Sequence, residues 1–309
     1  MASNESPTKT SRTKRKPAAA KSPVVMTEQR EELLYMVARY GYVSTPQLAK
    51  RFFGGNKQSS QLADTMRKLF DAGYIDRFQQ PSTASEAKNM PLISVLTQKG
   101  AEFITGSRGI DMSRLQVHST SDQPKATYFE HLLMVNDVRV IFELACEQSN
   151  YALKWLDERM IRKQRLYGEV LLSSDQEKGE KTSNIPDGFF SIKTTAGWLS
   201  FFLEIDRGTE KIAIIHKKAQ VYLAYEQTSH YAQHYGATTP SGDTAPLFVL
   251  LITNAAKRRD NVSASLGKAF PSQPFLCAAY PDLLPESVLS QLIWYAPNLN
   301  QAVSLIGTS

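Results

Sequence analysis

The sequence predicts a two-domain α/β protein. Its 309 residues exceed what one domain of ordinary size usually holds, and 42% of them are apolar, which supplies a substantial core. Two patterns indicate the class. Three short helices and a β-hairpin occupy the first third of the chain, and the order helix, three strands, helix, strand follows. We therefore expect domains at residues 24–115 and 128–309, joined by a polar linker at residues 116–127.

The composition excludes several classes of protein. Two cysteines, Cys146 and Cys277, are too few for a disulfide framework or a four-cysteine zinc site, which indicates a reducing compartment. No uninterrupted apolar run approaches the ~18 residues of a membrane span. The glycine patterns that bind nucleotide phosphates are also missing from the sequence. We expect a cytoplasmic protein with no membrane partner.

The basic charge is concentrated at the start of the chain. Residues 1–23 hold six basic groups against one acid, residues 24–115 hold 12 against 9, and residues 116–309 hold 18 against 20. Such asymmetry is typical of a chain that meets a polyanion at one end. Residues 1–23 also have no aromatic residue, so we expect a disordered arm. Its basic run at Thr13–Lys16 either contacts DNA phosphates or serves solubility.

Helix caps and breakers predict the elements of the first domain. Thr27 is an N-cap that precedes apolar residues at helical spacing, and Gly41 ends that run. Pro46 opens a second helix, Gly54 breaks it, and Gly73 ends a third. The expected strands are residues 74–78 and 92–96, separated by a loop rich in Pro, Ser and Thr at residues 81–89.

This order is that of a winged helix-turn-helix. The phrases LFDAGYIDR (Leu69–Arg77) and LTQKGAEFI (Leu96–Ile104) resemble the winged-helix modules of bacterial regulators. In that geometry the third helix enters the major groove of double-stranded DNA, and basic residues outside the groove contact phosphates. The alternative is a winged helix that makes protein contacts. The expected base contacts are Lys57, Ser60 and Gln61, and the expected phosphate contacts are Arg67, Lys68 and Arg77.

The second domain opens with a helix, Tyr128–Gln148, that is apolar on nearly every side and is therefore expected to be buried. A charged and poorly patterned stretch interrupts the strands that follow, and it ends at Asn184. An α/β arrangement around a mixed sheet results. The expected elements are strands at Tyr151–Leu156, Asp187–Thr194 and Trp198–Asp206, a helix from about Thr209 to Tyr235, strands at Pro246–Thr253 and Phe275–Ala279, and tail helices.

Carboxylates gather at the ends of two of these strands. Asp187 opens one strand, and Glu204 and Asp206 close the next. Adjacent antiparallel strands bring these groups to one end of the sheet, and converging carboxylates bind Mg²⁺ or Mn²⁺ because hard cations take oxygen ligands. The alternative is an ion-pair cluster in which Arg207 or a lysine of the following helix neutralises the acids.

The αβββαβ order with its PD…E-x-D pair resembles the restriction-endonuclease-like superfamily, whose signature is PD…(D/E)-x-K. The resemblance implies a metal site at Asp187 and Glu204, with Glu130 of the preceding helix as a further acid. It also implies DNA cleavage. Asp206 stands where the superfamily has its catalytic lysine, and a lysine of the following helix is available in its place. The catalytic residues implied are Asp187, Glu204, Asp206 and Lys218.

A second resemblance covers nearly the whole chain. Together with the winged helix, the phrases HLLMVNDVRV (His131–Val140), PDGFF and FFLEIDRGTEK (Phe201–Lys211) resemble the plasmid replication-relaxation family. This implies a DNA-binding accessory or regulator of a plasmid or integrative element, active in replication or mobilisation. Two other functions stay open: a Mg²⁺-dependent DNA nickase or endonuclease, and an adaptor that docks a relaxase or a replication protein. The oligomeric state stays open too, a homodimer included.

Overall fold

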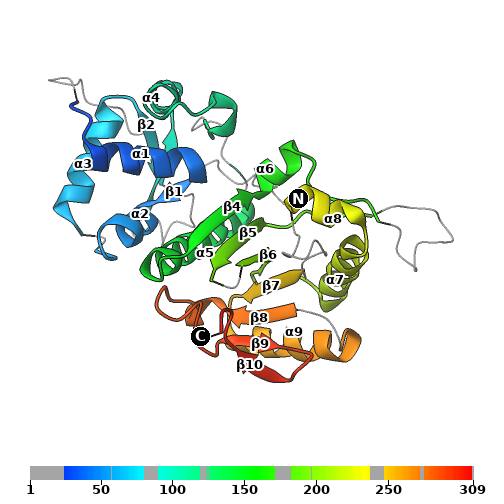
Figure 1. The fold of residues 1–309 in the computed structure, drawn as a ribbon. Helices are drawn as coiled ribbons and strands as arrows, with labels where there is room; N and C mark the ends of the chain where they lie inside the picture. The colour runs from blue at the N-terminus through cyan, green and yellow to red at the C-terminus, as the bar shows by residue number, and fades with distance from the viewer. Residues whose placement is uncertain are drawn as a thin grey trace, which may run out of the picture. The chain divides into compact units, whose positions relative to one another are not determined.

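A computed structural model gives the structure of residues 24–56, 58–79, 90–118, 124, 126–170, 182–195, 197–236, 247–271 and 275–307 (Figure 1). The chain divides into two compact units, Met1–Asn136 and Asp137–Ser309. Both contain helices and sheet, so the predicted two-domain α/β class is confirmed. The division lies inside one helix, α5 (Ala126–Gln148), further along the chain than the boundary expected at residue 128.

Unit 1 contains the expected three helices and hairpin, with one strand that the sequence did not reveal. Its sheet has the order β1-β3-β2, and both pairings are antiparallel. Strand β1 has two residues, which is too short for a period-2 pattern to be visible. The elements are α1 (Glu28–Tyr40), β1 (Val43–Ser44), α2 (Thr45–Phe52), α3 (Ser60–Asp71), β2 (Ile75–Gln79), β3 (Leu92–Leu96), α4 (Gln98–Arg108) and the short 3₁₀ helix η2 (Met112–Arg114).

Side-chain caps fix where the helices of unit 1 begin. Ser44 and Gln47 form a capping box at α2: the Gln47 amide N–H donates to Ser44 Oγ (3.3 Å), and the Ser44 amide N–H donates to Gln47 Oε1 (2.9 Å). At α3 the Leu62 amide N–H donates to Ser59 Oγ (3.3 Å). These bonds satisfy backbone donors that a helix start leaves without partners.

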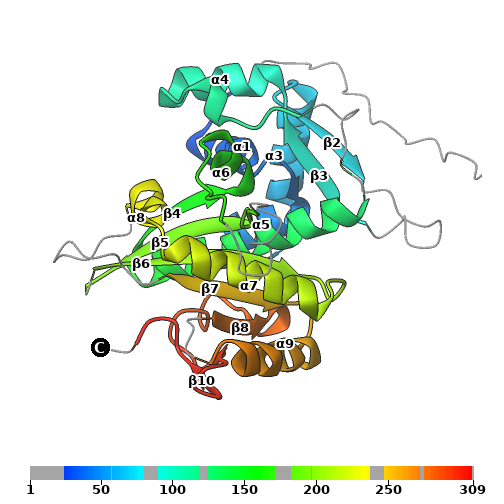
Figure 2. The same ribbon diagram turned by 90° about the vertical axis from the view of Figure 1, so that its right-hand side faces the viewer.

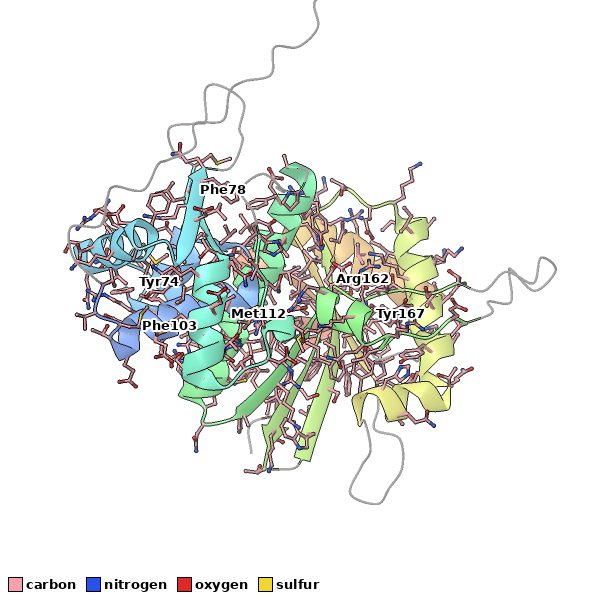
Figure 3. All side chains as sticks on the ribbon, turned by 90° about the horizontal axis from the view of Figure 1, so that it is seen from above. Tyr74, Phe78, Phe103, Met112, Arg162 and Tyr167 are labelled. Atoms are coloured by element: carbon pink, nitrogen blue, oxygen red, sulfur yellow. The ribbon has the colours of Figure 1, made fainter. Side chains whose placement is uncertain are left out.

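Helix α4 lies close to the turn before β2. The Phe103 and Tyr74 rings meet edge to face at 5.6 Å (Figure 3). Lys99 Nζ lies 4.8 Å from the Tyr74 ring centre. A Cβ atom built at Gly100 would overlap the Tyr74 carbonyl oxygen. Glycine at this position therefore permits the close approach of α4 to the hairpin.

Residues that the sequence assigned to a linker and to the second domain pack onto unit 1. The Gln116 amide N–H donates to the Ala38 carbonyl (3.1 Å), and the His118 ring stacks on Tyr42 at 4.3 Å. Phe129 of α5 is buried in a cluster with Tyr42, Phe78, Ile93 and Val95. Apolar burial thus places the first half of α5 in unit 1.

In the described residues, the sheet of unit 2 has seven strands in the order β10-β9-β8-β7-β6-β5-β4. Strands β4, β5 and β6 are antiparallel neighbours, whereas β6, β7 and β8 run parallel. The predicted order helix, three strands, helix, strand is present. The strands are β4 (Ala152–Asp157), β5 (Gly188–Thr194), β6 (Gly197–Asp206), β7 (Phe248–Thr253), β8 (Phe275–Ala279), β9 (Trp294–Ala296) and β10 (Gln301–Val303), and the helices besides α5 are α6 (Glu158–Lys163), α7 (Ile212–Glu226), α8 (Ser229–Tyr235), α9 (Ala256–Ala269) and the 3₁₀ helix η4 (Tyr280–Asp282).

Side chains on both faces of this sheet are buried. Phe190 of β5 packs against Phe142 of α5 at 4.6 Å, and its neighbour Phe189 belongs to a cluster with residues of α7, α8 and α9. Figure 2 shows α7 and α9 along one face of the sheet. Successive side chains of β5 point to opposite faces of the sheet, so the strand contributes apolar side chains to a layer on each face. None of the described helices combines the length and apolar content needed to cross a membrane.

Three expectations for unit 2 were wrong. The single helix expected from Thr209 to Tyr235 is two helices, because Thr228 interrupts it by donating from Oγ1 to the Tyr225 carbonyl (2.7 Å). Helix α9 was not expected, since few of its residues are apolar and buried. The tail forms strands β9 and β10 in place of helices, and the buried Trp294 fixes it by donating from Nε1 to the Val288 carbonyl (2.8 Å).

Candidate functional site

Asp187 and Glu204 come together at one end of the β5–β6 ladder. Gly188 is paired with Leu203, so the next positions in the same register are Asp187 and Glu204. The Asp187 amide N–H donates to the Leu203 carbonyl (3.0 Å), and the Ile205 amide N–H donates to Asp187 Oδ2 (2.8 Å). The sequence expected these two carboxylates to converge, and the backbone places them side by side.

Glu204 is 5% exposed, and three side chains from the described part of the chain contact its carboxylate. Asn184 Nδ2 donates to Oε1 (2.7 Å), Lys218 Nζ donates to Oε2 (2.9 Å), and the Tyr222 hydroxyl donates to Oε1. Burial and then the charge of Asp187 raise the pKa of Glu204, against the opposing effect of Lys218 and Tyr222. The carboxylate is thus desolvated and fully engaged by protein donors.

Lys218 and Tyr222 project from α7 to the end of β6. Lys218 Nζ also donates to Glu210 Oε1 (2.8 Å). Burial alone would lower the pKa of Lys218, but the charge of Glu204 and the hydrogen bonds to both glutamates raise it overall. Burial and then Glu204 raise the pKa of Tyr222 well above its ordinary value, so the hydroxyl stays a proton donor.

Asp206 has a cationic partner of its own. It is 3% exposed; Oδ1 accepts from the Gly208 amide N–H (2.8 Å), and Oδ2 lies 2.6 Å from Arg258 Nε. Arg258 also donates to the Glu210 carbonyl. The acid that stands where the superfamily signature has lysine is therefore neutralised from α9.

A cavity of about 20 Å³, room for roughly one water molecule, lies beside these groups. Its polar wall comes from the ends of β6 and α7, and its apolar wall comes from β7, β8 and α9. The lining residues are Glu204, Ile205, Asp206, Glu210, Ile215, Lys218, Ala219, Tyr222, Val249, Leu251, Leu266 and Phe275.

The carboxylates do not present an open metal site. Among the described residues, no group of three or more His, Cys, Asp or Glu side chains is placed to share a cation. Both oxygens of Glu204 and both of Asp206 already accept hydrogen bonds. A divalent cation at Glu204 would lie close to the Lys218 ammonium group, which would repel it. Glu130, expected as a further ligand, is an exposed residue of unit 1.

Sequence reasoning missed Asn184, Tyr222 and Arg258. Asn184 lies at the end of a stretch without periodicity, and Arg258 belongs to the helix that was not expected. Tyr222 follows Lys218 by four positions, so the two share a helix face. Once the helix is assigned, this spacing predicts that Tyr222 lies beside Lys218.

Two of the three residues expected to contact DNA bases, Ser60 and Gln61, lie at the start of α3. Ser60 and Gln61 are exposed, and Gln61 Nε2 donates to Gln29 Oε1 (2.8 Å). The buried stripe of α3 is Leu62, Thr65, Met66, Leu69 and Phe70. The exposed face therefore includes these two residues, as expected. Lys57 lies outside the described residues.

The expected phosphate contacts differ in exposure. Arg67 and Lys68 have side chains 62% and 42% exposed, and both contact Asp64, at 2.7 and 2.6 Å. Hydrogen bonds from Lys68 and then Arg67 lower the pKa of Asp64. Arg77 was expected to be exposed on the wing, but it is only 8% exposed, because alternation along β2 places it on the same face as the buried Ile75.

The replication-relaxation family matches residues 34–240, which is two thirds of the chain. The matched range includes α3 of unit 1 and the cluster from Asp187 to Lys218 of unit 2. No curated protein and no solved structure matches the chain significantly.

Proposed function

The chain belongs to the replication-relaxation family, and we propose that it is a DNA-binding accessory protein that acts in the replication or mobilisation of a plasmid or integrative element. In this proposal unit 1 is a winged helix-turn-helix that binds double-stranded DNA. Unit 2 is a scaffold of restriction-endonuclease-like topology that does not cut DNA.

The exposed face of α3 carries the proposal. This helix buries an apolar stripe and leaves Ser60, Gln61, Arg67 and Lys68 on the side away from the core. Ser60 and Gln61 belong to its first turn, from which recognition helices usually contact base edges. Glutamine pairs bidentately with adenine, which gives Gln61 a role in sequence preference.

The ion pairs of Arg67 and Lys68 with Asp64 are compatible with phosphate binding. Pairs between exposed side chains are weak, because water and salt screen them. A DNA phosphate therefore competes readily with Asp64 for these two cations. The basic excess of residues 1–115 adds a long-range attraction for DNA.

The closed ion-pair network favours a scaffold in unit 2. Glu204 and Asp206 are neutralised by Lys218 and Arg258, and their oxygens accept hydrogen bonds from protein groups. A scaffold of this kind needs no metal, because the protein supplies the compensating charge.

The experiment is a binding titration of the full-length protein with fluorescent duplexes of different sequence. Gln61→Ala is expected to reduce the difference in affinity between preferred and random duplexes. Lys68→Ala is expected to weaken binding to every duplex alike and to lower the slope of log K against log salt by about 1. Equal binding by wild type and both variants would remove α3 from the interface.

A Mg²⁺-dependent nickase or endonuclease is the second candidate. It is favoured by the register of Asp187 opposite Glu204 and by Lys218 Nζ at 2.9 Å from Glu204, since two acids and a lysine are the residue types of the superfamily signature. Conversion of supercoiled plasmid to open circles with Mg²⁺ or Mn²⁺, lost in Asp187→Ala, would support it over the accessory role.

A further inference from the structure

Two loops of unit 2 emerge at the same edge of the sheet. Strands β6, β7 and β8 run parallel, so the loops after β6 and after β7 both lie at their carboxyl ends. The first is Arg207–Lys211, which leads into α7. The second is Asn254–Ala255, which leads into α9. Ligands of open α/β sheets bind preferentially at this edge.

Direct contacts hold the two loops together. The Asn254 amide N–H donates to the Asp206 carbonyl (3.2 Å), and Arg258 reaches from α9 to both Asp206 and Glu210. Side chains on the two loops are therefore presented as one surface. Asp206, which is buried, fixes the position of this surface through its contacts with Asn254 and Arg258.

Cations dominate the exposed part of this surface. Lys211 and Lys257 are exposed, and Arg207 is half-buried. Of the nearby acids, Asp206 is paired with Arg258, and Glu210 shares the Lys218 ammonium group with Glu204. Arg259 is buried beneath this surface, where it contacts Asp260 and Asp282. The surface defined by Arg207, Lys211 and Lys257 is called the basic edge.

The helices that begin at the basic edge add to its positive potential. Neither α7 nor α9 has a side-chain N-cap, and neither has an acid in its first turn. Acids are the residues that stabilise the first turn of a helix, yet the exposed side chain in the first turn of α9 that the acids do not engage is Lys257. A bound anion would relieve the repulsion between Lys257 and the helix dipole.

We propose that the basic edge binds phosphates of the DNA backbone, so that unit 2 contributes sequence-independent affinity while α3 of unit 1 reads bases. This proposal rests on the proposed function, since duplex DNA is the polyanion that unit 1 would deliver. Flexible exposed lysines suit phosphate contacts, because a point charge positions the duplex without reading its sequence.

The test uses full-length protein and a fluorescent random-sequence duplex, with binding measured across a range of salt. Lys211→Ala with Lys257→Ala is expected to weaken binding and to lower the slope of log K against log salt by about 2, since each lost phosphate contact contributes about 0.9. Lys257→Arg is expected to retain the affinity of the wild type. The control is Lys268→Ala, an exposed lysine at the opposite end of α9, which should change neither quantity.

The possible results separate this proposal from the one before it. If the double variant behaves like Lys268→Ala while Lys68→Ala weakens binding, the basic edge is not an interface and the role of α3 stands. If the wild type does not bind duplex DNA even at low salt, both proposals fail. Thermal melts of each variant should show a single cooperative transition, because the substituted side chains lie at the surface and their loss leaves the core intact.

Discussion

Lys218 Nζ lies 2.9 Å from Glu204 Oε2 and 2.8 Å from Glu210 Oε1, so one ammonium group joins the end of β6 to the loop that follows it. Glu204 is buried, and Lys218 is the cation that compensates its charge. The loop held by this contact also carries Arg207 and Lys211. The contacts of Lys218 with Glu204 and Glu210 therefore help to fix the position of the basic edge.

Lys218→Met is expected to destabilise the protein by about 3 kcal/mol, because it leaves a buried carboxylate without its cation. Urea unfolding of the wild type and the variant measures the change. The control is Lys217→Met, the neighbouring exposed lysine, for which we expect a change within about 0.5 kcal/mol. A similar small change in Lys218→Met would show that the ion pair has no structural role.

Replacing Glu204 should alter the pH dependence of stability. Burial and Asp187 raise the pKa of Glu204 in the folded protein. The folded state then binds more protons than the unfolded state, so the free energy of unfolding falls as pH rises above the ordinary glutamate pKa of about 4.3. Glu204→Gln removes this titration. As pH rises from about 4.3 through the raised pKa of folded Glu204, the wild type should lose stability relative to the variant. A gain over that range would mean that Lys218 dominates the pKa of Glu204.

Divalent cations distinguish a closed ion-pair network from a metal site. A ligand that binds only the folded state raises its melting temperature by mass action. If the ion-pair network is closed, Mn²⁺ should not change the melting temperature of the wild type relative to EDTA, and it should not change that of Asp187→Ala either. A rise with Mn²⁺ in the wild type that Asp187→Ala abolishes would instead support the endonuclease candidate.

Two glycines of α4 provide a matched pair for the packing of unit 1. Gly100→Ala places a methyl group against the Tyr74 carbonyl and should cost about 1–3 kcal/mol by overpacking. A methyl group at Gly106 would meet no atom within 4 Å beyond the neighbouring backbone of its own helix. Gly106→Ala should therefore stabilise α4 by about 0.5–1 kcal/mol. Thermal melts of both variants check the opposite signs. Equal effects would mean that the approach of α4 to Tyr74 is not tight.

Local signals were sufficient for much of the fold. Thr27 was predicted to begin the first helix as its N-cap, and it does, because capping depends on residues a few positions apart. Ser44 and Ser59 cap the next two helices in the same way. The β5–β6 hairpin followed from two apolar runs around a glycine turn, so the pairing of Asp187 with Glu204 was predictable as well.

Partners distant in the sequence were not predictable. Asp206 and Arg258 are 52 positions apart, and nothing local to either residue indicates the pairing. Arg77 looked like a wing residue because it is basic and follows a turn, but the pleat of β2 turns it toward the core. The break between α7 and α8 lies at Thr228, whose amide and hydroxyl both donate to the Tyr225 carbonyl, and the apolar pattern around it did not indicate a break.

The most direct test of the central claim is an agarose gel of supercoiled plasmid incubated with the full-length protein in EDTA, in Mg²⁺ and in Mn²⁺. A non-cleaving DNA-binding accessory should retard the plasmid under all three conditions, lose that retardation as salt rises, and leave the DNA supercoiled after the protein is removed. No retardation in EDTA, or open-circular and linear DNA formed with Mg²⁺ or Mn²⁺, would contradict it.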